Sequence, residues 1–171
     1  MTKIKLTAHP IIIFTAITIL SSCRRDDVEQ QTTYSKSGIV INSAQEVPAL
    51  ANLSSAVGTL NVNYSKLSKT LTYNFSWSGL TGPVTAFHIH GLDPIGFSHP
   101  QNVFQTFVVA SIVPCKVNGV NGPTSCGSYS GTLYIDGVAI KEADLLNGMY
   151  YVNIHTAANG GGEIRGQIVF Q

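Results

Sequence analysis

Apolar and polar residues alternate with a period of two along much of the chain, and this alternation restricts the fold class more than any other feature. In the clearest case, Leu71, Tyr73, Phe75 and Trp77 alternate with polar residues. Successive side chains of a strand point to opposite faces, so this segment has one apolar and one polar face. Further strands are predicted at 57–64, 85–90, 104–112, 129–135, 149–155 and 163–170, and one or two helical turns at 140–147. Turn residues separate the segments, so we expect an all-β fold, an antiparallel β-sandwich with long loops.

The N-terminus has the pattern of an export signal. Lys3 and Lys5 precede an apolar run at 11–20, which is too short to span a bilayer comfortably. The run ends in Leu-Ser-Ser-Cys at Cys23, which resembles a bacterial lipobox and implies cleavage before Cys23 and its lipidation. An ordinary secretory signal with an incidental cysteine is the alternative. We therefore expect a signal peptide (1–22), a flexible tether with lipidated Cys23 (23–37) and a folded domain (38–171).

This organisation predicts a protein of the bacterial cell envelope, held on the lipid bilayer through Cys23 and facing the periplasm or the cell surface. Only 11% of the residues are charged and the formal net charge is +1. The chain therefore has no basic surface that would favour nucleic acid. Two cysteines remain after Cys23, and their spacing is wrong for a CxxC metal or redox pair. In an exported protein, Cys115 and Cys126 are expected to form a disulfide.

Three histidines are the strongest candidates for a functional site. His88 and His90 point to the same side of one predicted strand, and His155 ends another. Imidazole nitrogens are ligands for copper and zinc, so a shared copper or zinc site is one hypothesis. The alternative is a hydrogen-bonded network that fastens neighbouring strands without an ion.

Other polar residues share these faces. Glu163 and Arg165 lie two apart on one strand and point away from its apolar side. They could orient a ligating histidine or attract an anion, or they could form an exposed ion pair. Gln45 and Glu46 are expected to satisfy backbone groups near an edge strand. We find no catalytic constellation such as a nucleophile elbow.

From about residue 41 to its C-terminus, the chain resembles the CHRD domain, which was named after chordin and also occurs in microbial secreted proteins. Four blocks carry the resemblance in order: 42–48, 86–91, 148–156 and 161–168. The resemblance implies an all-β extracytoplasmic module. The expected role is non-enzymatic, as an envelope module that binds an unidentified envelope or extracellular protein, polymer or ligand. Chordin's role as a growth-factor antagonist does not follow from the shared fold.

A second, weaker resemblance is to copper/zinc superoxide dismutase. The segment 86–90 is similar to the first copper-ligand motif of that family, and His155 is similar to its last ligand. By this resemblance His88, His90 and His155 bind copper and Arg165 guides a small anion. His99 is the only candidate for a bridging histidine, and the zinc-site cluster has no counterpart. The expected sandwich is Greek-key, superoxide-dismutase-like or immunoglobulin-like. The alternative function is a copper- or zinc-binding protein with this three-histidine site, and superoxide-dismutase-like redox activity is one version of that alternative.

Overall fold

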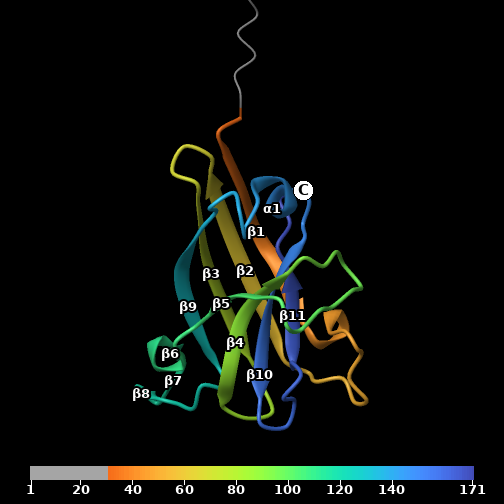
Figure 1. The fold of residues 1–171 in the computed structure, drawn as a ribbon. Helices are drawn as coiled ribbons and strands as arrows, with labels where there is room; N and C mark the ends of the chain where they lie inside the picture. Colours follow the sequence, from red (N-terminus) through yellow and green to blue (C-terminus); the bar gives the residue numbers. More distant parts are fainter. Residues whose placement is uncertain (1–30) are drawn as a thin grey trace, which may run out of the picture. The chain divides into compact units, whose positions relative to one another are not determined.

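A computed structural model describes residues 31–171, which form an almost entirely antiparallel β structure (Figure 1). The expected signal peptide and the lipidated Cys23 lie outside the described residues. No helix between residues 31 and 171 has the length and apolar character needed to cross a membrane.

Nine strands of the described region form one sheet, in the order β5-β4-β10-β11-β1-β2-β3-β9-β6, and every neighbouring pair is antiparallel. A separate hairpin consists of β7 and β8. The strands are β1 (Thr33–Asn42), β2 (Val57–Ser65), β3 (Thr70–Ser78), β4 (Val84–Gly91), β5 (Val103–Thr106), β6 (Val113–Pro114), β7 (Lys116–Val117), β8 (Val120–Asn121), β9 (Gly127–Tyr134), β10 (Tyr150–Thr156) and β11 (Ile164–Gln167). The helix α1 (Glu142–Leu146) and two 3₁₀ turns, η1 (Ser43–Gln45) and η2 (Val109–Ser111), complete the fold.

The all-β prediction is confirmed, and several segments differ from it, among them the strand expected at 163–170, which ends at Gln167. The strand expected at 104–112 ends at Thr106, because the chain then forms the η2 turn. At the other end, β1 begins at Thr33, within the segment expected to be tether. Residues 33–36 are ordered because their backbone pairs with β2, in register with Val62 to Ser65.

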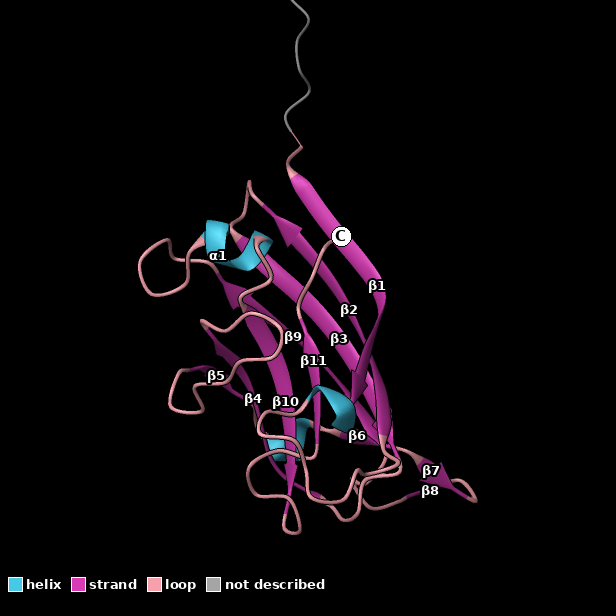
Figure 2. Ribbon diagram, turned by 90° about the vertical axis from the view of Figure 1, so that its right-hand side faces the viewer, coloured by secondary structure: helices cyan, strands magenta, loops and turns pink. Residues whose placement is uncertain are grey.

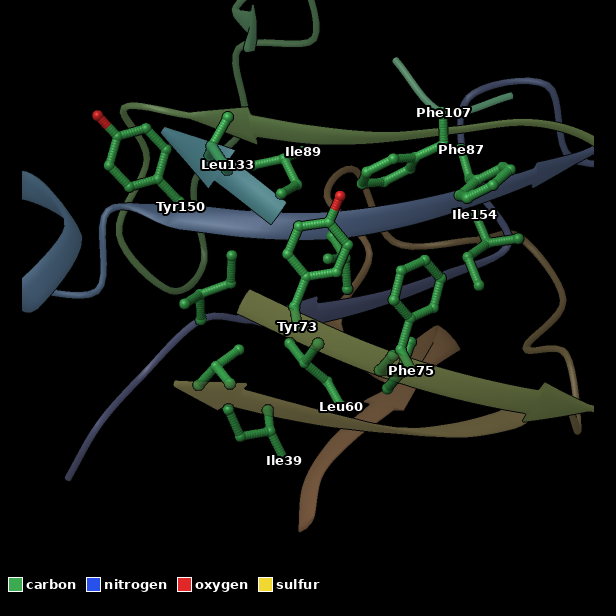
Figure 3. Close-up of a cluster of buried hydrophobic side chains, with 14 of the residues drawn as sticks. Ile39, Leu60, Tyr73, Phe75, Phe87, Ile89, Phe107, Leu133, Tyr150 and Ile154 are labelled. Atoms are coloured by element: carbon green, nitrogen blue, oxygen red, sulfur yellow. The ribbon is translucent and has the colours of Figure 1, made fainter. Parts of the chain in front are cut away.

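The sheet curls so that its two ends face each other and enclose an apolar core, as in a sandwich. In Figure 2, β1, β2 and β3 lie on one side of the molecule and β4, β5 and β10 on the other. Figure 3 shows Phe87 and Phe107 from one side facing Tyr73 and Phe75 from the other. The phenol of Tyr73 donates a hydrogen bond to Gln105 on β5, which joins the two sides. Alternation in β3 thus supplies an aromatic face that the opposite layer covers.

The strands β4, β10 and β11 are neighbours, which the histidine hypothesis required (Figure 1). As expected, Tyr150, Val152 and Ile154 of β10 face the core and are fully buried. The opposite face of these strands is largely buried rather than exposed to solvent. Arg165 and Glu163 are only 1% and 0% exposed. The long loops after β1 and β4 cover much of this face, as their buried members Glu46 and Asp93 show.

The disulfide between Cys115 and Cys126 is present, as the sequence predicted. It closes the segment that contains the small β7–β8 hairpin. The backbone N–H of Cys115 also donates to the carbonyl of Cys126 at 3.0 Å. The bridge therefore fastens a poorly buried segment to the start of β9.

Candidate metal centre

The register of two strands brings the three histidines together. On β4, His88 pairs with Asn153 of β10 and His90 pairs with Tyr151. His155 lies two residues beyond Asn153, on the same face of β10. One ring nitrogen from each histidine can be chosen so that all three lie within 4.8 Å of one another. The structure therefore joins residues that are more than sixty positions apart in the sequence.

The hydrogen bonds of the cluster define its tautomers. The Nδ1 of His155 lies 3.0 Å from the carbonyl oxygen of Gly160, which can only accept, so this nitrogen carries the proton. The Nε2 of His155 then carries the lone pair and accepts a hydrogen bond from Nδ1 of His88, which lies 3.0 Å away. The carbonyl of Gly160 thus orients His155 in the way that outer-shell groups orient metal-ligating histidines.

His90 is the most deeply placed ring, with 4% of its surface exposed. Its buried Nδ1 has no hydrogen-bond partner. Burial, and then the neighbouring His88 and His155, lower the pKa of His90 to about 4. Burial also lowers the pKa of both His88 and His155. All three imidazoles are therefore neutral at pH 7, the protonation state that metal coordination requires.

The histidines lie in a cavity of about 450 Å³, which we call the histidine cleft. Besides the three rings, it is lined by the polar residues Glu46, Ser98, Tyr151 and Asn153, the apolar residues Val47, Pro48, Pro100 and Val103, and the glycines 160 and 161. The lining comes from β4, β10 and the start of β5, and from the loops that cover them. The cleft thus combines metal-ligating side chains with an apolar rim.

Glu46 contributes to this cleft in a way that the sequence did not indicate. Instead of satisfying backbone groups at an edge strand, its two carboxylate oxygens accept hydrogen bonds from Nδ2 of Asn153 at 2.8 and 2.9 Å. Burial raises the pKa of Glu46 to about 8, although Arg165 and the bond from Asn153 oppose this shift. The one sign of the Glu46–Asn153 pair in the sequence was that Asn153 is polar and lies on the same strand face as His155. Gln45 does satisfy backbone groups, those of Val40 and Gln167.

Arg165 approaches the cleft through an aromatic stack. Its guanidinium lies 3.5 Å from the ring centroid of Tyr151, which in turn stacks on His90 at 5.1 Å. The guanidinium also donates hydrogen bonds to the carbonyl of Phe97 and to the side chain of Gln167. The expected role in guiding anions stays a prediction. These contacts give Arg165 a structural role, because they hold the loop after β4 against β11.

Glu163 lies apart from Arg165, so the expectation of an exposed ion pair is wrong. Its carboxylate accepts hydrogen bonds from the hydroxyls of Ser54, Thr81 and Thr156. Burial opposes ionisation, but these hydrogen bonds outweigh it and lower the pKa of Glu163. Glu163 therefore links the loops that hold Ser54 and Thr81 to β10, and it makes no hydrogen bond to any of the three rings. The backbone group that orients His155 is the carbonyl of Gly160.

His99, the one candidate for a bridging histidine, lies outside the three-histidine group. Its Nδ1 pairs instead with the buried carboxylate of Asp93, which also accepts a hydrogen bond from the His99 backbone. The His99 side chain is 67% exposed. The described residues therefore offer a single three-histidine centre and not the paired sites that superoxide dismutase has.

The family model of the CHRD domain matches residues 38–168. This range contains all the strands from β2 to β11 and every residue of the histidine cleft. No curated protein and no solved structure matches the chain. Because the match covers about three quarters of the sequence, the chain belongs to the CHRD domain family.

Proposed function

We propose that this CHRD module is a non-enzymatic metal-binding protein of the bacterial cell envelope, with copper or zinc held by His88, His90 and His155. The observation that carries the proposal is the convergence of three neutral imidazoles within 4.8 Å. This choice favours the metal-binding alternative over a module that binds only a protein or polymer.

The donor set fits such an ion. In a tetrahedral site with metal–nitrogen bonds near 2 Å, ligand nitrogens lie about 3.3 Å apart. The pair formed by His88 and His155 already has a nitrogen separation of 3.0 Å. The unpartnered Nδ1 of His90 supports the same interpretation, because buried polar atoms normally have a partner. Three protein ligands leave one position free, and the cleft adjoins it.

The location of the protein is part of the same proposal. Lipidation at Cys23 would hold the module on a bilayer, and the disulfide between Cys115 and Cys126 suits an oxidising compartment. The test is metabolic labelling with a radioactive fatty acid in a bacterial host. Label should enter the wild type and be absent from Cys23→Ser. Equal labelling of the two proteins would refute the anchor.

The metal site is tested by element analysis of protein purified without chelator and dialysed against copper or zinc. We expect about one ion per chain in the wild type, and loss of binding when all three histidines are replaced by alanine. The matched control is His99→Asn, which removes an imidazole outside the cluster and keeps a hydrogen-bond donor beside Asp93.

Binding should also weaken as the pH falls, because protons compete with the metal for the imidazoles. Substoichiometric metal in the wild type, or equal uptake by the triple-alanine variant, would refute the proposed function. Circular dichroism should show that the triple variant is folded, so that lost uptake reports lost ligands.

A further inference from the structure

The histidine cleft extends well beyond the space that one ion needs. Its volume of about 450 Å³ lies within the usual range of small-molecule sites. Val47 and Pro48 from one covering loop, Pro100 from the other and Val103 at the start of β5 supply an apolar rim. This composition suits a ligand with a flat apolar body and polar groups at one end.

An unpartnered acceptor lies next to the histidines. Asn153 is only 3% exposed, and its Oδ1 has no hydrogen-bond partner, while its Nδ2 is committed to Glu46. A buried acceptor without a partner is costly, so the position favours a ligand that donates a hydrogen bond. Because Asn153 pairs with His88 and lies two residues from His155, such a ligand would lie beside the metal.

Apart from the proposed metal ion, the described side chains around the cleft supply no free cation for an anion. Arg165, the nearest guanidinium, is 1% exposed, and its hydrogen bonds go to Phe97 and Gln167. Among the residues that line the cleft, the ionisable side chains are those of the three histidines, Tyr151 and Glu46. In the metal-free protein, burial raises the pKa of the Glu46 carboxyl to about 8, so it is largely protonated at pH 7. Apart from the metal ion, these lining residues therefore offer hydrogen-bonding groups and no second cation.

We infer that the histidine cleft binds a neutral one-ring aromatic molecule with adjacent hydroxyl groups, of the catechol class. One hydroxyl would give its proton to the solvent and its oxygen would bind the metal, the second hydroxyl would donate to Oδ1 of Asn153, and the ring would pack against the apolar rim. This inference rests on the proposed metal site, because the first contact requires the ion.

The test uses the zinc-loaded protein, since zinc has no redox chemistry that would consume the probe. Titration calorimetry with 4-methylcatechol is compared with its methyl ether, 4-methylguaiacol, and with benzoate, an anion of similar size. We expect the catechol to bind with one site per chain and more tightly than either control. The triple-alanine variant should bind none of them through zinc, and zinc content is measured after each titration.

Chelation alone also favours a catechol over its ether, so a protein variant isolates the hydrogen bond. Asn153→Leu removes the acceptor at nearly constant volume, and the uncharged form of Glu46 tolerates an apolar neighbour. The ratio of catechol to guaiacol affinity should fall about tenfold in this variant, as expected for one hydrogen bond to a buried group. A ratio equal to that of the wild type would overturn the inference.

The two proposals fail in distinguishable ways. If the wild type retains no zinc, the metal site itself is refuted. If zinc is retained but benzoate binds more tightly than 4-methylcatechol, or the catechol removes zinc from the protein, the inference about the ligand is overturned and the metal site stands. The benzoate comparison needs only the wild type, so it decides the question even if Asn153→Leu does not fold.

Discussion

The pH dependence of stability in Glu46→Gln tests the cleft most directly, because it depends on the burial of one carboxyl. The folded protein holds the pKa of Glu46 at about 8, compared with 4.5 for an ordinary glutamate. Between these values the folded state binds more protons at Glu46 than the unfolded state does. The free energy of unfolding therefore falls as the pH rises, by about 1.4 kcal/mol per pH unit from this group.

Glutamine does not titrate, so Glu46→Gln removes this fall. From pH 5.5 to pH 7.5, the free energy of unfolding of the variant should rise relative to the wild type by about 3 kcal/mol. The assay is urea denaturation at half-unit pH steps, with the disulfide intact and with a chelator present. Groups that titrate in both proteins cancel in the difference, so only the contribution of Glu46 remains.

Glu142→Gln is the matched control. Its carboxylate accepts a hydrogen bond from Tyr64 at 2.7 Å and pairs with Lys66 at 3.3 Å, and these contacts lower its pKa. Glu142 therefore titrates below the window, and its variant should differ from the wild type by a constant amount between pH 5.5 and 7.5. A flat difference for Glu46→Gln as well would refute the buried, largely protonated carboxyl on which the neutral cleft depends.

Three further predictions follow from other contacts. Gly162 has a φ of +130° and an added Cβ would lie 2.7 Å from a carboxylate oxygen of Glu46, whereas a Cβ at Gly161 meets nothing within 4 Å. Gly162→Ala should therefore cost about 1–3 kcal/mol in urea denaturation and weaken zinc binding, and Gly161→Ala should do neither. Reaction of the folded protein with a thiol reagent should find Cys115 and Cys126 blocked, and replacing both by serine should cost about 3 kcal/mol. Because burial lowers the pKa of the three cleft histidines, the unfolded state binds more protons below about pH 6.5. The metal-free Glu46→Gln protein should consequently lose stability between pH 6.5 and pH 4.5, and a constant stability there would contradict the burial of the rings.

Local patterns in the sequence were sufficient to predict the strands and their inward faces. The alternation of Leu71, Tyr73, Phe75 and Trp77 predicted the aromatic side of β3, and all four side chains are buried. The same rule predicted that His88 and His90 would point away from Phe87 and Ile89. Such patterns are readable because side-chain direction along a strand depends only on the local backbone.

Long-range pairing decided the rest. The strands β4, β10 and β11 are neighbours, and this brings His155 to His88. The arrangement depends on the curl of the whole sheet and on contacts between distant segments. The covering loops have no periodicity, so no local pattern indicated that Glu46 would be buried beside Asn153 or that Arg165 would be enclosed. The charge and pKa of a group depend on what packs over it, and that is a property of the tertiary structure alone.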